Sequence, residues 1–269
     1  MTAASLDVVV CEVADRVATV TLNRPEARNA LSSEVLRTLP GVMARADADP
    51  EVDVIVLTGR DPAFCAGLDL KELGSSGGNL RVEPAEPSPG DANRGVRRGP
   101  WGQLRKPIIG AVNGVAITGG LELALNCDLL VASERARFAD THSRVGVMPG
   151  WGLTVLLAEA VGVRRAREMS FTGNFVPAAL AYDWGLVNHV VSHEELLPFC
   201  RRLAADISGN DQRGVQRMKE TYTAVTDVGA GEGWAVEARM GREWAAGGID
   251  PASVEARRQG ILQRGRAQL

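Results

Sequence analysis

The amino-acid sequence predicts an α/β protein whose last quarter is helical, and two observations support this prediction. Short, nearly all-apolar segments alternate with helix-like segments from the N-terminus to about His193, and such alternation is typical of α/β architecture. Beyond that point the strand-like segments stop and helical periodicity continues. We therefore expect a core domain at residues 1–193 and a helical region at residues 194–269.

The first elements are expected to be a β-hairpin and a helix. Leu6–Val13 and Arg16–Leu22 are rich in Val and Thr and flank a turn-like pair of residues, a pattern that indicates two antiparallel strands. Either Ser32 or Ser33 can cap the helix that follows, which is expected to run to about residue 48. The chain thus opens with a strand pair and a helix.

Strand and helix then recur along the middle of the chain. Asp53–Thr58 is a short apolar run typical of a strand buried on both faces. Ile108–Val112 is strand-like, Gly119–Leu125 is helix-like, and Asp128–Ala132 is strand-like again. This order supports the α/β prediction.

A long loop and a set of C-terminal helices complete the prediction. Gly74–Gly99 is rich in Gly, Pro and Ser and lacks apolar periodicity, which predicts a mobile surface loop. The expected C-terminal helices cover Glu194–Ile207, Gln212–Val225, Gly233–Trp244 and Pro251–Arg266.

Composition excludes several functional classes. A chain of 269 residues with 45% hydrophobic residues can bury a large core, and its net charge of −3 gives no broad basic field for nucleic acid or an anionic membrane. The four cysteines show neither a CxxC pair nor a neighbouring His cluster, so no disulfide framework or zinc site is expected. The sequence shows neither a secretory leader pattern nor a run of about 20 apolar residues. We expect a soluble cytoplasmic protein.

Two glycine-containing segments carry the residues suited to chemistry. Ala63–Lys71 (AFCAGLDLK) and Asn113–Ala124 (NGVAITGGLELA) each follow a strand-like run, and backbone amides at the start of a helix carry partial positive charge. Glu122 lies three residues beyond Gly119, so it would sit one turn into a helix, on the side of the free amides. Taken alone, Gly119-Gly120 is more often an ordinary strand-to-helix turn, and Glu122 is more often a solvated helix residue. The GxGxxG, GxxxxGK[ST], GxSxG and HExxH motifs are absent.

The combination of these segments resembles the crotonase (enoyl-CoA hydratase) superfamily. AFCAGLDLK is followed by KPIIGAVNGVAITGGLELALNCDLLVAS and then by ARFADTHSRVGVMPGWG, and the similarity in order and spacing covers nearly the whole chain. The resemblance implies a spiral of ββα units and a helical C-terminal region that mediates assembly into a homotrimer or a dimer of trimers. It also implies an acyl-CoA thioester substrate and no metal or redox cofactor.

The resemblance assigns roles to particular residues. It implies an oxyanion hole formed by the backbone N–H groups of Leu68 and Gly119, and Glu122 matches the first of the two glutamates of typical hydratases. The residues implied to bind the CoA and thioester part of the substrate are Ala66, Leu68, Asp69, Leu70, Lys71 and Gly119. Met148 and Trp151 are expected in the pocket wall.

The second glutamate of the family pattern is missing. Alignment of FADTH with the family's F-x-x-P-E places His142 at that position, and an imidazole can orient water and deliver a proton. The alternative is that His142 only fills space. Thr118, where many relatives have Gly, is a second departure, and His189 and His193 are interpreted as structural.

The leading hypothesis is hydration of a 2-enoyl-CoA to a 3-hydroxyacyl-CoA. Another thioester-enolate reaction, such as isomerisation, decarboxylation or carbon-carbon bond hydrolysis, is the alternative, although the family's isomerases rely on the carboxylate that His142 replaces. A non-catalytic or RNA-binding homologue is disfavoured by the presence of Glu122 and by the acidic composition.

Overall fold

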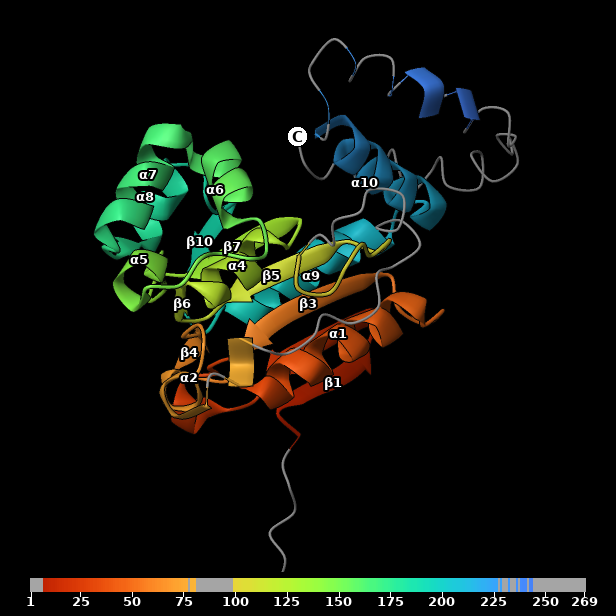
Figure 1. Cartoon of the computed structure of the whole chain (residues 1–269). Coiled ribbons are helices and arrows are strands. Elements are labelled where there is room, and N and C mark those ends of the chain that lie inside the picture. The colour runs from red at the N-terminus through yellow and green to blue at the C-terminus, as the bar shows by residue number, and fades with distance from the viewer. Residues whose placement is uncertain are drawn as a thin grey trace, which may run out of the picture. The chain divides into compact units, whose positions relative to one another are not determined.

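The structure is a computed structural model that describes residues 7–76, 78–80 and 99–226, together with short runs and single positions up to residue 243. By its contacts the chain divides into two units, Met1–Gln216 and Arg217–Leu269. The first unit contains both sheets and the candidate site (Figure 1).

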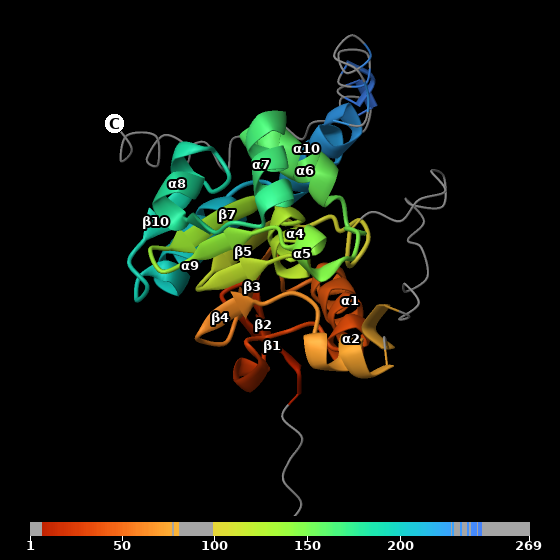
Figure 2. The ribbon, with the colours of Figure 1, turned by 60° about the vertical axis from the view of Figure 1, so that its left-hand side comes forward.

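A six-stranded sheet forms the centre of the first unit. Its strands are β1 (Val9–Ala14), β2 (Val17–Leu22), β3 (Val54–Gly59), β5 (Ile108–Val112), β7 (Leu129–Ser133) and β10 (His189–Val191), in the order β1-β2-β3-β5-β7-β10. The expected hairpin is confirmed, because β1 and β2 pair antiparallel, whereas all later neighbours pair parallel. Figure 2 shows β1, β2, β3, β5 and β7 in this sequence across the sheet.

A second sheet consists of very short strands. It contains β4 (Ala63–Cys65), β6 (Val115–Ile117), β8 (Arg137–Ala139) and β9 (Val176–Pro177), in the order β4-β6-β8-β9. β4, β6 and β8 each follow a strand of the large sheet after a short turn, and each is followed by a helix. This repetition confirms the expected α/β spiral of ββα units.

The helices keep the same chain order. They are α1 (Ser33–Ala48), α2 (Leu70–Ser76), α4 (Gly119–Leu125), α5 (His142–Val145), α6 (Leu153–Val161), α7 (Val163–Thr172), α8 (Ala178–Asp183), α9 (Leu196–Ser208) and α10 (Gln212–Thr226), with short 3-10 helices at Pro25–Ala27 and Gly78–Leu80. α1 begins as expected, because the hydroxyl of Ser32 accepts a hydrogen bond from the N–H of Val35 at 3.3 Å. α4 has the predicted bounds.

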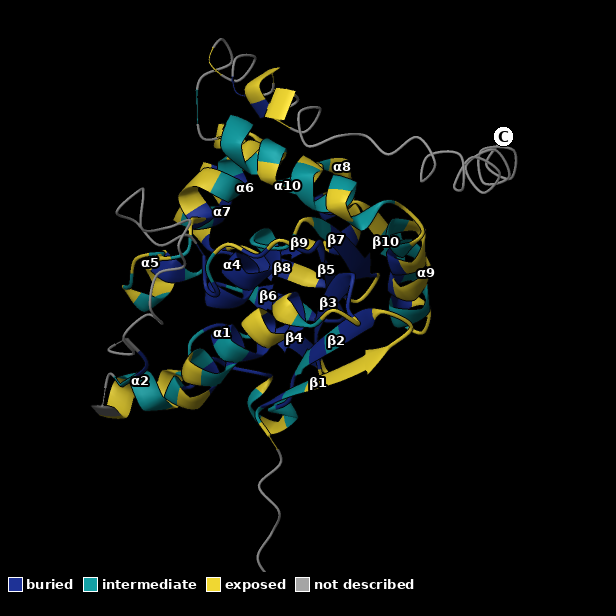
Figure 3. Ribbon diagram, turned by 90° about the vertical axis from the view of Figure 1, so that its right-hand side faces the viewer, coloured by how far each residue is buried: buried dark blue, intermediate teal, exposed yellow. Residues whose placement is uncertain are grey.

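The core is built on both faces of the large sheet. Ile55 and Leu57 of β3 belong to the cluster that includes α1, whereas Val54 and Val56 belong to the cluster that includes α9. Because alternate side chains of a strand point to opposite faces, β3 is buried on both sides, as its all-apolar sequence predicts. Figure 3 shows the inner strand β3 in the buried colour, whereas the edge strand β1 is largely exposed.

The expected loop and C-terminal helices lie partly outside the described residues. The expected loop at residues 74–99 begins inside α2 and includes the 3-10 helix Gly78–Leu80, and residues 81–98 lie outside the described part. By contacts the chain divides after Gln216, and α9 packs on the large sheet. The division into residues 1–193 and 194–269 stays a prediction. The expected helix at residues 233–244 is helical at each described position, and the one at residues 251–266 lies outside the described residues.

Among the described helices, none is long and apolar enough to cross a membrane.

Candidate active site

Glu122 lies at the centre of the candidate site, on the first turn of α4. Its side chain is buried with 3% of the residue exposed, and Oε1 accepts hydrogen bonds from the backbone N–H of Trp151 at 2.7 Å and of Gly150 at 3.2 Å. Gly120 lets α4 approach β4, since a Cβ there would lie 2.1 Å from the carbonyl oxygen of Cys65. The carboxylate is therefore held in one orientation by two amides of a distant loop.

The backbone amides of Leu68 and Gly119 are available for a ligand. Leu31 and Leu68 form an isolated β-bridge through two hydrogen bonds: the Gly67 carbonyl accepts from the N–H of Leu31 at 2.8 Å, and the Leu31 carbonyl accepts from the N–H of Asp69 at 3.1 Å. The N–H of Leu68 takes part in neither bond. In the described part of the chain neither the Leu68 nor the Gly119 N–H donates to a protein acceptor. Gly67 adopts a φ of +85°, which a residue with a side chain rarely does.

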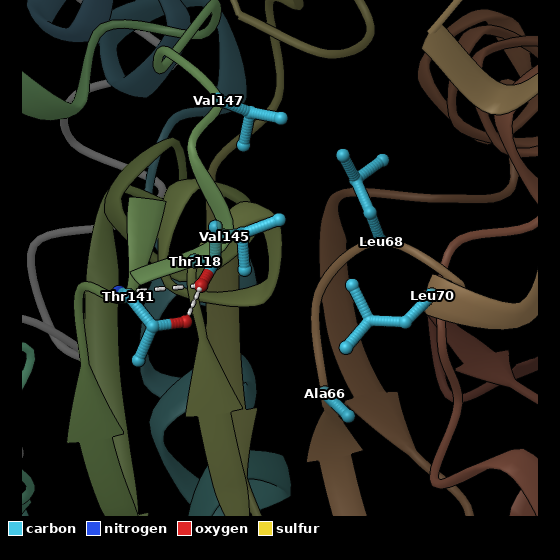
Figure 4. Close-up of a pocket in the computed structure, with 7 residues that line it drawn as sticks. All are labelled: Ala66, Leu68, Leu70, Thr118, Thr141, Val145 and Val147. Atoms are coloured by element: carbon cyan, nitrogen blue, oxygen red, sulfur yellow. Dashed lines mark hydrogen bonds between the residues drawn. The ribbon is translucent and has the colours of Figure 1, made fainter. Parts of the chain in front are cut away.

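A small pocket lies between the loop after β4 and the segments after β6 and β8 (Figure 4). On one side it is lined by Ala66, Leu68 and Leu70, and on the other by Thr118, Thr141, Val145 and Val147. The lining is apolar except for the two threonine hydroxyls. Thr118 and Thr141 precede Gly119 and His142 directly, so the pocket wall adjoins the segments that carry the candidate catalytic groups.

His142 begins α5 and lies between two carboxylates. Its Nδ1 is 2.6 Å from Oδ1 of Asp140, and its Nε2 is 3.5 Å from Oε2 of Glu122. The second distance is long for a hydrogen bond but within ion-pair range. All three side chains are buried, with 6% of His142 and 2% of Asp140 exposed.

The two carboxylates decide the protonation of His142. Burial alone would lower the pKa of the imidazole, but hydrogen bonding and charge from Asp140 and Glu122 outweigh it and raise the pKa to about 9. Burial would likewise raise the pKa of Asp140, but hydrogen bonds from His142 and the Ser170 side chain lower it. The two acids thus favour the imidazolium form of His142, in which both ring nitrogens are protonated.

The structure brings most of the residues singled out in the sequence into one place, but not all. Ala66, Leu68 and Leu70 line the pocket, whereas Asp69 and Lys71 do not. The carboxylate of Asp69 instead accepts from the guanidinium of Arg24 at 3.0 Å and from the Lys71 N–H at 3.1 Å. Glu122 and His142 contact each other but are not part of the lining.

The contacts that Trp151 and Thr118 make in the site were not predicted from the sequence. Trp151 donates its backbone N–H to Glu122, and its ring lies 3.9 Å from where a Cβ of Gly119 would be, although it is not among the residues that line this pocket. Met148 does not line this pocket and is 85% exposed. Thr118 has a φ of 54°, unusual for a β-branched residue, and its hydroxyl lies 2.5 Å from that of Thr141. A threonine where many relatives have glycine is the sequence signal for this contact.

Among the described residues, no group of three or more His, Cys, Asp or Glu side chains could hold a metal ion.

Comparisons with known proteins cover most of the chain. The family described as enoyl-CoA hydratase/isomerase matches residues 12–247. A relative from Arabidopsis thaliana, named probable enoyl-CoA hydratase 1, peroxisomal, is 37% identical over 231 residues, which cover 86% of this chain and 84% of the relative. The crystal structure of enoyl-CoA hydratase from Mycobacterium tuberculosis H37Rv aligns with a TM-score of 0.73 and 44% identity, covering 88% of this chain and 98% of that one. A monofunctional enoyl-CoA isomerase from M. smegmatis aligns with a TM-score of 0.68 and 31% identity, covering 85% and 98%.

Proposed function

The chain belongs to the enoyl-CoA hydratase/isomerase family, and we propose that it is an enoyl-CoA hydratase, a lyase that adds water to a 2-enoyl-CoA thioester to form a 3-hydroxyacyl-CoA. The observation that carries the proposal is the buried Glu122, oriented by two amides and with Oε2 3.5 Å from Nε2 of His142. Relatives named as enoyl-CoA hydratases support the same reaction. The reaction needs no cofactor besides the CoA of the substrate.

The amides of Leu68 and Gly119 are proposed to bind the thioester carbonyl oxygen. Water attack at Cβ moves the double-bond electrons toward this oxygen, and fixed N–H donors stabilise the charge as it develops. One such donor is worth about 3–4 kcal/mol in enzymes that use an oxyanion hole. Both amides are free of protein acceptors in the described structure, as this role requires.

Glu122 is proposed to take the proton from the attacking water. Its Oε1 is fixed by the Gly150 and Trp151 amides, so Oε2, the oxygen that faces His142, is left to accept the proton of the attacking water. A positioned base contributes a rate factor of about 100–10,000.

His142 is proposed to deliver the other proton, to Cα. As an imidazolium it carries a proton on Nε2, the nitrogen that faces Glu122. A carboxylic acid at this position would have to be kept neutral to act as a donor, whereas an imidazolium donates in its charged form. A histidine in place of the family's second glutamate is therefore compatible with hydration.

Double-bond isomerisation is the second candidate, supported by the isomerase from M. smegmatis among the similar structures. Incubation of the protein with enoyl-, 3-hydroxyacyl- and malonyl-type CoA esters, followed by mass spectrometry, separates the candidates. Hydration adds the mass of one water to the 2-enoyl ester. An unchanged mass with a shifted double bond identifies isomerisation instead, and loss of carbon dioxide from the malonyl ester identifies decarboxylation.

Assembly and location belong to the same proposal. We infer a homotrimer or a dimer of trimers, as the family resemblance implies, and a cytoplasmic location, as expected from the sequence. Light scattering coupled to size-exclusion chromatography measures the first, and a mass of one or two chains contradicts it. Fractionation of expressing cells measures the second.

A further inference from the structure

We propose that Asp140 is a positioning residue of this site, whose carboxylate fixes the His142 ring so that Nε2–H faces Glu122 and serves as the proton donor. The catalytic consequence of this inference rests on the proposed function. The contact between the Asp140 and His142 side chains does not depend on it.

The geometry leaves the imidazole one available orientation. Oδ1 of Asp140 lies 2.6 Å from Nδ1 of His142 and also accepts from its backbone N–H at 3.1 Å. Asp140 thus binds the ring and the start of α5 with one oxygen. Since Nδ1 is committed to this contact, Nε2 is the nitrogen left to act on Glu122 or on substrate.

The surrounding helices hold Asp140 and α5 in place. The side chain of Ser170, on α7, hydrogen-bonds to Asp140, and the Ser143 hydroxyl donates to the Ser170 carbonyl at 2.7 Å. Arg144, the nearest cation on α5, donates to the carbonyl of Thr172 at 2.9 Å. The titratable groups that act on His142 are therefore Asp140 on its own segment and Glu122 on α4, with the Ser170 hydroxyl contributed by α7.

A carboxylate this deeply buried requires a charged or multiply hydrogen-bonded partner. The three side chains form a chain in which a central cation lies between two anions, and this arrangement favours the imidazolium. Removing the Asp140 charge would leave His142 with one carboxylate at 3.5 Å. The ring would then lose both its anchor and part of the reason to stay protonated.

The protons balance over one turnover. The water oxygen bonds to Cβ, the double-bond electrons move toward the thioester, and the water proton passes to Glu122. The proton on Nε2 of His142 passes to Cα. Transfer of the Glu122 proton to Nε2, between atoms 3.5 Å apart, restores both groups, and the net change is the addition of one water.

The test is a titration of the His142 ring in the full-length protein by nitrogen-15 NMR. The chain has only three histidines, and His142→Asn identifies the signal. We expect the wild-type ring to titrate with a midpoint of about 9, and Asp140→Asn to move the midpoint toward the ordinary value of about 6.5. A wild-type midpoint near the ordinary value overturns the inference without any variant.

Kinetics with 2-enoyl-CoA test the catalytic consequence. Asp140→Asn should lower kcat by at least about tenfold at mildly alkaline pH, the low end expected for loss of a general acid, with little change in KM. Its activity should recover toward wild type as the pH falls below the new midpoint, which loss of structure would not produce. If the variant keeps both the wild-type midpoint and the wild-type pH profile, Asp140 is not a positioning residue.

The matched control is Asp61→Asn, which removes the carboxylate beside a different histidine, His193. It should leave the His142 midpoint and hydration unchanged, and a shift in either contradicts the specific role of Asp140. A response of His142 to Asp140→Asn in a protein that hydrates no enoyl-CoA supports the positioning contact and overturns the hydratase assignment.

Discussion

Two histidines of this chain each lie between two polar partners, but their surroundings differ. His142 lies between Asp140 and Glu122, and all three side chains are buried next to the pocket wall. His193 lies between Ser133 and Asp61, with Nδ1 3.2 Å from the hydroxyl and Nε2 3.0 Å from the carboxylate. The first group contains two buried acids, and the second contains one acid whose side chain is 63% exposed.

The second group shows why residue types alone do not make a site. Ser133, His193 and Asp61 are the residue types of a serine-nucleophile triad. However, the Ser133 residue is fully buried, its hydroxyl accepts the N–H of Arg135 at 3.1 Å, and it does not line the described pocket. These contacts connect the end of β7 to the segment after β10 and to the turn between β3 and β4. A structural role explains them, as expected from the sequence.

Removing one carboxylate from each group should give the largest contrast. Glu122→Gln keeps the size of the side chain and removes the base, so kcat should fall by about 100–10,000-fold while acyl-CoA still binds. Asp61→Asn should leave kcat unchanged. Single-turnover rates with 2-enoyl-CoA measure both, and wild-type hydration by the Glu122 variant would show that it is not the base.

Removing the imidazole from each group should give a smaller difference in kcat, again with the larger loss at the buried group. His142→Ala should lower kcat by at least about tenfold, the low end for loss of a general acid or base. His193→Ala should leave kcat unchanged and lower the free energy of unfolding by about 1 kcal/mol for each hydrogen bond lost. His142→Glu should keep hydratase activity, because it restores the carboxylate pair of the family. Equal kcat values for the two alanine variants would make His142 a bystander.

The pH profile should distinguish the protonated histidine from a carboxylate pair. The sequence alone suggests an ionisation near neutrality, but the two acids move the pKa of His142 to about 9. Because a proton donor must be protonated, kcat/KM should fall as the pH rises through this value. The alkaline fall should be absent in His142→Ala and unchanged in His193→Ala. A wild-type profile that is flat through this region would argue against His142 as the acid.

The part of the site that was predictable depends on local signals. The bounds of α4 and the place of Glu122 follow from a glycine-rich turn and a short helical run, and β3 follows from an uninterrupted apolar segment. The resemblance of the motifs to a known family added the pairing of Leu68 with Gly119.

The rest depends on contacts between distant segments. The amides that hold Glu122 come from residues 28 and 29 positions away, and nothing in VMPGWG marks them as donors. β4, β6 and β8 have three residues each, too few for a periodic pattern to appear. The raised pKa of His142 needs two acids at known distances, and only one of them is its neighbour in sequence.

The smallest expected effect is on stability, and its sign follows from the direction of the His142 shift. A group whose pKa is raised on folding stabilises the native state fully below its unfolded pKa, about 6.5 for histidine, and this contribution is lost as the pH rises through the folded value of about 9. Folding lowers the pKa of Asp140, so its contribution to stability is lost only at acid pH. Asp140 therefore does not change the unfolding free energy in the pH range where His142 does.

Denaturant unfolding of wild type and His142→Asn at one protein concentration measures this contribution. The difference in unfolding free energy should be largest below about pH 6.5 and should shrink by about 1–3 kcal/mol by the time the pH exceeds the folded pKa. If the difference in unfolding free energy between wild type and His142→Asn is constant across this pH range, folding does not raise the pKa of the imidazole.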